Sequence, residues 1–146
     1  MEISNRDKKM FAAAKAVAET SDFNGAHIGC VVSIGRNILS VASNSEKTHT
    51  LQKIYNKFRN FDAEVYPNKV HAEVHALSWL IGKDIDWSKI DVYIYREWKD
   101  GTPAISKPCI SCFHLMQDLG IKQVCYVDNL GNYTKTSIEE LSKDFE

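Results

Sequence analysis

Two short motifs contain the residue types that bind a metal ion and move protons. His71 and Glu73 form the pattern H-x-E, and Cys109 and Cys112 form the pattern P-C-x-x-C further along the chain. Zn²⁺ binds neutral imidazole and thiolate sulfur tightly. A structural zinc site usually has four protein ligands, whereas a catalytic site leaves one position open for water. The three ligands His71, Cys109 and Cys112 therefore predict one catalytic Zn²⁺ per chain.

Glu73 is the predicted catalytic acid–base group. If a helix begins at His71, Glu73 lies in its first turn and faces the water that completes the zinc coordination. Zinc lowers the pKa of such a water toward about 7. A carboxylate beside it takes the proton and returns it to the substrate and to the leaving group.

The two cysteines have the spacing that places both sulfur atoms on one face of a helix. Pro108 precedes them, and proline is favoured where a helix begins. A helix N-terminus lowers the pKa of a thiol, which favours the thiolate that zinc needs. By itself C-x-x-C also fits a redox pair or half of a structural zinc site, and H-x-E alone is common. The two motifs in this order favour the catalytic zinc site.

Length and composition bound the class of protein. The chain has 146 residues, 44% hydrophobic and 25% charged, which predicts a single domain over 1–146. The net charge of −1 argues against a strongly basic nucleic-acid binder but leaves a local basic groove open. We find no long apolar run and no apolar signal core near residue 1, so we expect a cytoplasmic protein that does not insert into membranes. Cys30 and Cys125 lie in apolar runs and are predicted to be buried free thiols.

Hydrophobic periodicity predicts alternating helices and strands after an initial helix and hairpin. The expected helices are 4–20, about 70–81, about 109–119, and a last one through 141; the expected strands are 27–34, 38–43, 91–96 and 121–127. Val70, Val74, Leu77 and Ile81 should form the core stripe of the second helix, with Asn68 as its cap. Strands that alternate with helices favour crossovers and parallel pairing. The fold prediction is a three-layer α/β/α sandwich with a mixed sheet of about five strands, four of them assigned, and zinc between two helix N-termini.

Three features allow both a functional and a purely structural interpretation. Asn44 ends the second strand, where it is either a turn former or a substrate contact. His75 lies one helical turn after His71 and is either part of the site or a structural histidine. The stretch 45–68 has no firm assignment; its basic and aromatic residues, densest over 52–61, either bind phosphates and bases or form an ordinary packed segment.

The order of elements and both motifs resemble the cytidine/deoxycytidylate deaminase superfamily of zinc-dependent nucleobase deaminases. The resemblance covers about residues 8–128. Within the superfamily, the chain looks closer to the deoxycytidylate and tRNA-adenosine branches than to the free-cytidine deaminases, because Leu-Gly-Ile-Lys and a strand follow the cysteine helix. It implies that the same three ligands bind zinc and that Glu73 shuttles protons. It also implies that Asn44 contacts the sugar and that the backbone of Ala72 and the segment Lys107–Pro108 line the base pocket. The loop from Asp128 corresponds to the place where related enzymes choose neighbouring bases.

The resemblance predicts hydrolysis of a cytosine nucleotide or nucleoside to the uracil form and ammonia, in a homo-oligomer. A second hypothesis keeps this chemistry but changes the substrate to a cytosine or adenosine base in single-stranded DNA or tRNA. A third is a zinc-stabilised binding domain without turnover, although such a site has no use for Glu73. His75 stands where mononucleotide deaminases often have Asn, and Ile105-Ser106-Lys107 replaces the Ser-Trp-Ser of polynucleotide enzymes. These departures leave the choice of substrate open.

Overall fold

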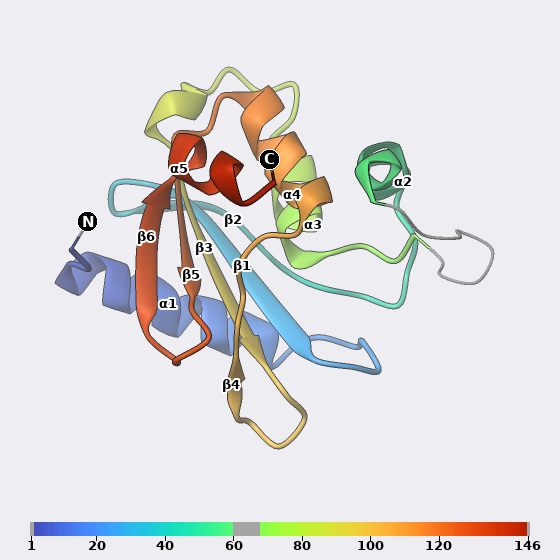
Figure 1. The fold of residues 1–146 in the computed structure, drawn as a ribbon, viewed down its shortest axis with the longest axis vertical. Coiled ribbons are helices and arrows are strands. Elements are labelled where there is room, and N and C mark those ends of the chain that lie inside the picture. The colour runs from blue at the N-terminus through green and yellow to red at the C-terminus, as the bar shows by residue number, and fades with distance from the viewer. Residues whose placement is uncertain (1, 60–67, 146) are drawn as a thin grey trace.

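The protein is seen in a computed structural model, which describes residues 2–59 and 68–145. The helices are α1 (Asn5–Ala18), α2 (Thr50–Tyr55), α3 (Ala72–Ser78), α4 (Ile110–Leu119) and α5 (Ile138–Ser142). The strands are β1 (His27–Ile34), β2 (Asn37–Ser43), β3 (Asp91–Glu97), β4 (Pro103–Ala104), β5 (Gln123–Val127) and β6 (Tyr133–Ser137). Within the described residues they form one sheet in the order β2-β1-β3-β5-β6, with the two-residue strand β4 paired to β3 (Figure 1).

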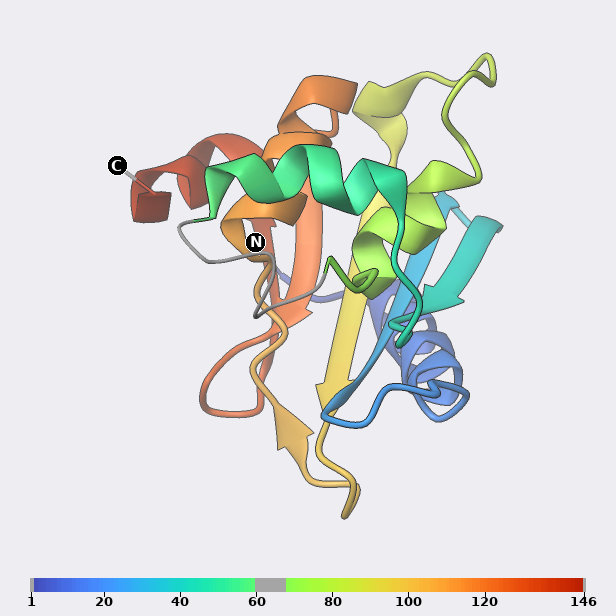
Figure 2. The same ribbon diagram turned by 90° about the vertical axis from the view of Figure 1, so that its right-hand side faces the viewer.

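Helices cover both faces of this sheet, which gives the predicted three layers. Alternate residues of β3 point to opposite faces, so Val92 and Ile94 pack with α3 and α4 while Tyr93 and Tyr95 pack with α1. The two views show α1 on one side of the sheet and α3 and α4 on the other (Figures 1 and 2). The mixed α/β/α sandwich expected from the sequence is confirmed.

Helix α1 begins at a capping box and lies unusually close to β1. Ser4 accepts a hydrogen bond from the Asp7 backbone N–H, and the Asp7 carboxylate accepts one from the Ser4 N–H. At the other end of the helix, a Cβ on Gly29 would meet the Ala14 carbonyl oxygen at 2.0 Å and the Ala18 nitrogen at 2.5 Å. Glycine is therefore required in β1 at the point where the helix backbone crosses it.

Strand directions differ in part from the expectation of parallel pairing after the hairpin. β3 pairs in parallel with β5, as expected for strands joined through a helix, but it is antiparallel to β1. β6 adds an antiparallel edge next to β5. The segment 133–137, which had no strand assignment, supplies this fifth long strand; its residues are polar and partly exposed, so an alternating hydrophobic signal is weak.

The second predicted helix is shorter than its hydrophobic pattern indicates. α3 contains Ala72–Ser78 rather than 70–81, and His71 rather than Asn68 is its N-cap. Val70 is buried in an extended segment before the helix, whereas Ile81 is 45% exposed, so the prediction that Ile81 belongs to the core stripe was wrong. The side chain of Asn68 instead accepts a hydrogen bond from Asn56 Nδ2 at 2.9 Å.

Two further expectations concern thiols and membranes. Cys30 and Cys125 are both buried and free, as predicted. Over the described ranges 2–59 and 68–145, none of the helices has the length and hydropathy needed to span a membrane.

Candidate metal centre and substrate cavity

His71 is positioned by the start of α3 and by a buried glutamine. Its backbone is extended, with φ −78° and ψ 155°, as is usual for an N-cap residue. The His71 N–H donates to Gln52 Oε1 at 3.0 Å, and Gln52 Nε2 donates to Asn56 Oδ1 at 2.8 Å. Gln52 is fully buried in α2. Sequence analysis missed this glutamine, which holds the backbone of a predicted metal ligand.

Cys109 is the N-cap of α4 and is held in place by the segment before it. Ser106 Oγ donates to the Ile94 carbonyl at 2.7 Å and accepts from the Val127 N–H at 2.7 Å. These bonds attach the loop to β3 and β5 at once. α4 then carries Cys112 one turn after Cys109 and ends at Gly120, whose φ of +88° is a left-handed cap.

The three predicted ligands converge on one point. His71 Nδ1 lies 3.5 Å from Cys109 Sγ and 3.4 Å from Cys112 Sγ, and the three ligand atoms lie within 4.8 Å of one another. Tetrahedral coordination with Zn–N near 2.05 Å and Zn–S near 2.3 Å places such atoms about 3.6 Å apart. The residues therefore fit a zinc ion, with the ring nitrogen Nδ1 as the histidine ligand.

The electrostatics of the trio favour a thiolate. A hydrogen bond from Cys112 and the neighbouring His71 hold the pKa of the Cys109 thiol well below its usual range, although burial opposes this. Burial acts to lower the pKa of His71, but the Cys109 thiolate outweighs it and the net pKa is raised. Deprotonated sulfur is the form that binds zinc.

Glu73 lies in the first turn of α3 beside this group. It is only 4% exposed, and its Oε1 atom has no hydrogen-bond partner among the described residues. Burial raises the pKa of its carboxyl group, with the charge of His71 acting in the opposite direction. A buried carboxylate oxygen without a partner is unfavourable unless a ligand completes its hydrogen bonds.

A cavity of about 650 Å³ opens above the trio and Glu73. This size falls within the usual range for small-molecule sites. Its wall includes Asn44 and Lys107, two of the four residues expected to contact substrate. The other two are not among the described residues of the wall: Ala72 is fully buried as the first residue of α3, and Pro108 is buried before α4.

The sequence of the chain matches a known family over most of its length. The model of the cytidine and deoxycytidylate deaminase zinc-binding region matches residues 4–128. The chain belongs to this family. No sequence among curated proteins matches the chain.

Two solved structures share the fold of this deaminase-family chain. A cytidine deaminase from Burkholderia pseudomallei superposes with a TM-score of 0.65 at 18% identity, covering 92% of this chain and 94% of that one. The apo form of a dCMP deaminase from the cyanophage S-TIM5 superposes with a TM-score of 0.57 at 17% identity, covering 85% of this chain and 82% of that one. At such identities the comparison establishes the fold, and family membership establishes a zinc-binding protein.

Asn44 lines the deaminase-family cavity but also has a clear structural role. Its Oδ1 atom accepts from the Ile28 N–H at 2.9 Å and lies 2.7 Å from Ser21 Oγ, while Nδ2 donates to the Ala26 carbonyl at 3.0 Å. The amide thus joins the end of β2 to β1 and to the loop before it. One N–H of Nδ2 is left over from these contacts for a ligand.

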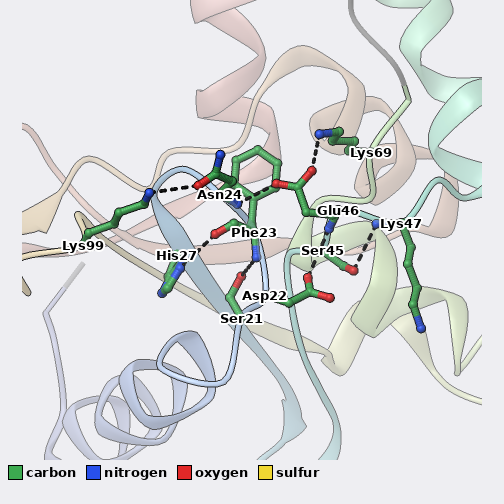
Figure 3. Close-up of polar contacts among 10 residues, drawn as sticks. All are labelled: Ser21, Asp22, Phe23, Asn24, His27, Ser45, Glu46, Lys47, Lys69 and Lys99. Carbon is green, nitrogen blue, oxygen red and sulfur yellow. Dashed lines mark hydrogen bonds and ion pairs between the residues drawn. The ribbon is translucent and has the colours of Figure 1, made fainter.

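A polar network between two loops surrounds Phe23 and Lys69, two residues of the cavity wall (Figure 3). The Asn24 N–H donates to Glu46 Oε1 at 2.6 Å, the Glu46 N–H donates to Asp22 Oδ1 at 3.1 Å, and the Glu46 carboxylate pairs with Lys69. Lys69 also lies over the ring of Phe23, 5.6 Å from its centroid. The network holds Phe23 in the cavity wall, a position that no local sequence signal indicated.

Where the structure describes it, the stretch 45–68 packs against α4 and also places Asn56 and Arg59 in the cavity wall. Tyr55 donates to Asp118 Oδ2 at 2.7 Å, and Phe58 stacks on His114 with ring centroids 3.7 Å apart. Both contacts attach this stretch to α4. Residues 60–67, including part of the predicted basic and aromatic segment, lie outside the described residues.

His75 is placed on the structural side of its two interpretations. Its Nδ1 atom lies 3.1 Å from the Ser43 carbonyl, and its ring stacks on Trp79 at 5.7 Å. It does not line the cavity over the described part of the chain. The loop that begins at Asp128 is also absent from the described cavity wall. The Asp128 carboxylate accepts hydrogen bonds from the Leu130 and Asn132 N–H groups within this loop, at 2.9 Å in each case.

Proposed function

We propose that the protein is a zinc-dependent hydrolytic deaminase that converts a cytosine nucleotide or nucleoside to its uracil form and ammonia. The single observation that carries this proposal is Glu73, whose buried and unpartnered Oε1 atom lies beside a trio of zinc ligands in a cavity. A purely structural zinc site has no use for such a carboxylate. Family membership is consistent with the same chemistry.

The reaction replaces the amino group on cytosine C4 by oxygen from water. Zinc, when held by His71, Cys109 and Cys112, supplies an acidified water as the nucleophile at neutral pH. Glu73 Oε1 would accept one proton of the attacking water and pass it to N3 of the ring as the C4–O bond forms, and would then accept the proton of the new C4 hydroxyl and pass it to the leaving amine. The C4–N bond breaks, ammonia leaves, and the ring becomes uracil.

Phe23 and Ile94 belong to the wall that would hold the flat base, while Asn44 has one N–H free for a sugar hydroxyl. Near-neutral net charge favours a small substrate over a polynucleotide. The packing of Tyr55 and Phe58 on α4 leaves these rings less available for stacking bases. We also propose that residues 1–146 act as one deaminase domain, in the cytoplasm and as a homo-oligomer.

The test is ammonia release by the zinc-loaded protein from cytosine, cytidine, deoxycytidine, CMP, dCMP, single-stranded DNA and a tRNA anticodon stem, with Glu73→Ala as the blank. Turnover of a mononucleotide or nucleoside supports the proposal. Turnover confined to DNA or RNA would replace it with the polynucleotide hypothesis. Zinc retention without any turnover would favour a binding domain.

A further inference from the structure

The basic side chains of the cavity are not equivalent. Among the described residues, the lysine and arginine side chains that line the cavity are Arg59, Lys69, Arg96 and Lys107. Lys69 has a carboxylate partner in Glu46, and Lys107 has one in Asp144. Both lysines are therefore neutralised at the rim by the protein itself.

Arg96 has a different environment. Among the described residues no carboxylate forms an ion pair with it, and its Nε atom is buried without a hydrogen-bond partner. The guanidinium carbon lies 5.0 Å from the centroid of the Trp98 ring. A guanidinium stacked in this way keeps its in-plane N–H groups free to donate. A partly buried cation without an anion is unfavourable, so the geometry favours an anionic group of a ligand.

The alternation of β3 places Arg96 two residues beyond Ile94 along the cavity wall. Ile94 and Arg96 point to the same face of the sheet because they are two residues apart in β3, and Trp98, the first residue after the strand, stacks on Arg96. Ile94 packs in the core under α3 and α4, whose N-termini carry the metal ligands, whereas Trp98 is half exposed. Arg96 lies between them, about 7 Å further out along the strand than Ile94. A ligand whose base reaches the metal centre extends toward Arg96.

We infer that Arg96 binds the phosphate of a mononucleotide substrate and makes the site selective for nucleotides over nucleosides. This inference rests on the proposed function, since it assumes a cytosine base at the metal centre. Phosphate is the anionic group that a nucleotide has and a nucleoside lacks. The planar fork of arginine donates two parallel hydrogen bonds to phosphate oxygens, which a lysine cannot do. Arg96 acts here as a specificity-determining residue and takes no part in proton transfer.

The first experiment measures kcat/KM of the zinc-loaded protein for deoxycytidine and dCMP, in the wild type, Arg96→Met, Arg96→Lys and Arg36→Met. Arg36 is an exposed arginine in the β1–β2 turn, so its replacement removes the same charge away from the cavity. We expect the wild type to prefer dCMP. Arg96→Met should reduce kcat/KM for dCMP roughly 10- to 150-fold, as expected for a charged hydrogen bond, and leave deoxycytidine within roughly threefold.

The ratio of the two substrates is measured on one preparation, so a lower folded fraction of Arg96→Met cancels. Arg96→Lys should recover only part of the dCMP preference, and Arg36→Met should behave as the wild type. The inference is overturned if deoxycytidine is the better substrate of the wild type, or if Arg96→Met reduces both substrates equally. It is also overturned if a short cytosine oligonucleotide without a terminal phosphate is preferred over dCMP.

A binding measurement separates failure of the inference from failure of the proposed function. Titration calorimetry of dCMP into zinc-loaded Glu73→Ala, with and without Arg96→Met, does not need turnover. Weaker dCMP binding on loss of Arg96, together with no turnover of any substrate by the zinc-loaded wild type, would support the phosphate contact and sink the proposed deaminase activity. Equal dCMP binding with and without Arg96 would overturn the inference while leaving the deaminase proposal untouched.

Discussion

Asp7 and Glu73 are two buried carboxylates on opposite faces of the same sheet, and their surroundings are opposite in kind. Asp7 is fully buried and accepts hydrogen bonds from Tyr93 at 2.5 Å, from Lys135 at 2.7 Å and from the Ser4 N–H at 2.9 Å. Glu73 has an oxygen with no partner among the described residues. The first carboxylate connects α1 to β3 and β6, whereas the second is left available to a ligand.

The pKa values differ in direction for the same reason. Burial acts to raise the pKa of Asp7, but the hydrogen bonds from Lys135 and Tyr93 outweigh it and lower the pKa to about 2. Burial raises the pKa of Glu73 without comparable compensation. A carboxylate with complete hydrogen bonds stabilises the fold, and one with incomplete bonds is suited to accept and donate protons.

The largest expected effect is on activity, from Glu73→Gln. The amide keeps the shape of the side chain but cannot accept the proton, so the deamination rate should fall roughly 100- to 10,000-fold. Zinc content and the urea unfolding midpoint should stay at the wild-type level, because Glu73 is not a ligand. An active Glu73→Gln variant would remove the proton-shuttle role and break the comparison with Asp7.

Cys109→Ala tests the other component of the site. Changes to residues behind the ligands already weaken zinc binding 10- to 100-fold in known sites, so loss of a ligand should weaken it more than about 100-fold. Because metal binding is coupled to folding, the unfolding midpoint should fall as well. The checks are zinc content after dialysis and chelator competition; Cys125→Ala, a buried free thiol outside the site, is the matched control. Wild-type zinc affinity in Cys109→Ala would exclude this cysteine as a ligand.

Asp7→Asn should have the opposite profile from Glu73→Gln. It leaves the Lys135 ammonium, whose side chain is only 14% exposed, without its anion. Removing one partner of a buried pair typically destabilises a protein by about 3 kcal/mol or more. Urea unfolding measures the loss, and kcat/KM should stay unchanged. Recovery of part of the stability in Asp7→Asn/Lys135→Met would support the pairing, and a parallel loss of activity would contradict the separation of the two faces.

Acid should selectively remove the contribution of Asp7. Its folded pKa of about 2 lies below the ordinary value of 3.8, so its stabilisation is complete above about pH 4 and is lost as the pH falls toward 2. A shift of nearly two units corresponds to about 2.5 kcal/mol. The difference in unfolding free energy between wild type and Asp7→Asn should shrink by about this amount between pH 5 and pH 2. Zinc loss affects both proteins and cancels; a constant difference would show that Asp7 is not held ionised.

The smallest expected effect is that of Ser4→Ala. This change removes the cap that accepts from the Asp7 N–H at 3.0 Å, and it should destabilise the protein by about 1 kcal/mol. Ser4→Thr keeps a hydroxyl and should lose less. Urea unfolding of both variants provides the measurement. A loss in Ser4→Ala as large as that of Asp7→Asn would mean that the cap, rather than the Lys135 pair, gives Asp7 its importance.

Local patterns predicted α1, the β1–β2 hairpin, β3 and α4 well, because each combines hydrophobic periodicity with a turn or cap nearby. α3 was predicted too long at both ends: the expected helix 70–81 begins two residues before the observed Ala72–Ser78 and ends three residues after it. Its start is set by the extended backbone of His71, which Gln52 holds from a distant helix. β6 was missed because its polar residues become a strand only through pairing with β5.

The sequence by itself determined the chemistry of the metal centre, because H-x-E and P-C-x-x-C are each local and place their side chains at helix N-termini. Tertiary structure alone decided which other polar groups are satisfied. Asn44 completes its hydrogen bonds with β1 and Asp7 with β3 and β6, whereas the buried Nε of Arg96 has no hydrogen-bond partner among residues 2–59 and 68–145. Hydrogen bonding and burial depend on contacts between residues far apart in the chain. The residue pattern around Arg96 therefore does not distinguish it from any other arginine at the end of a strand.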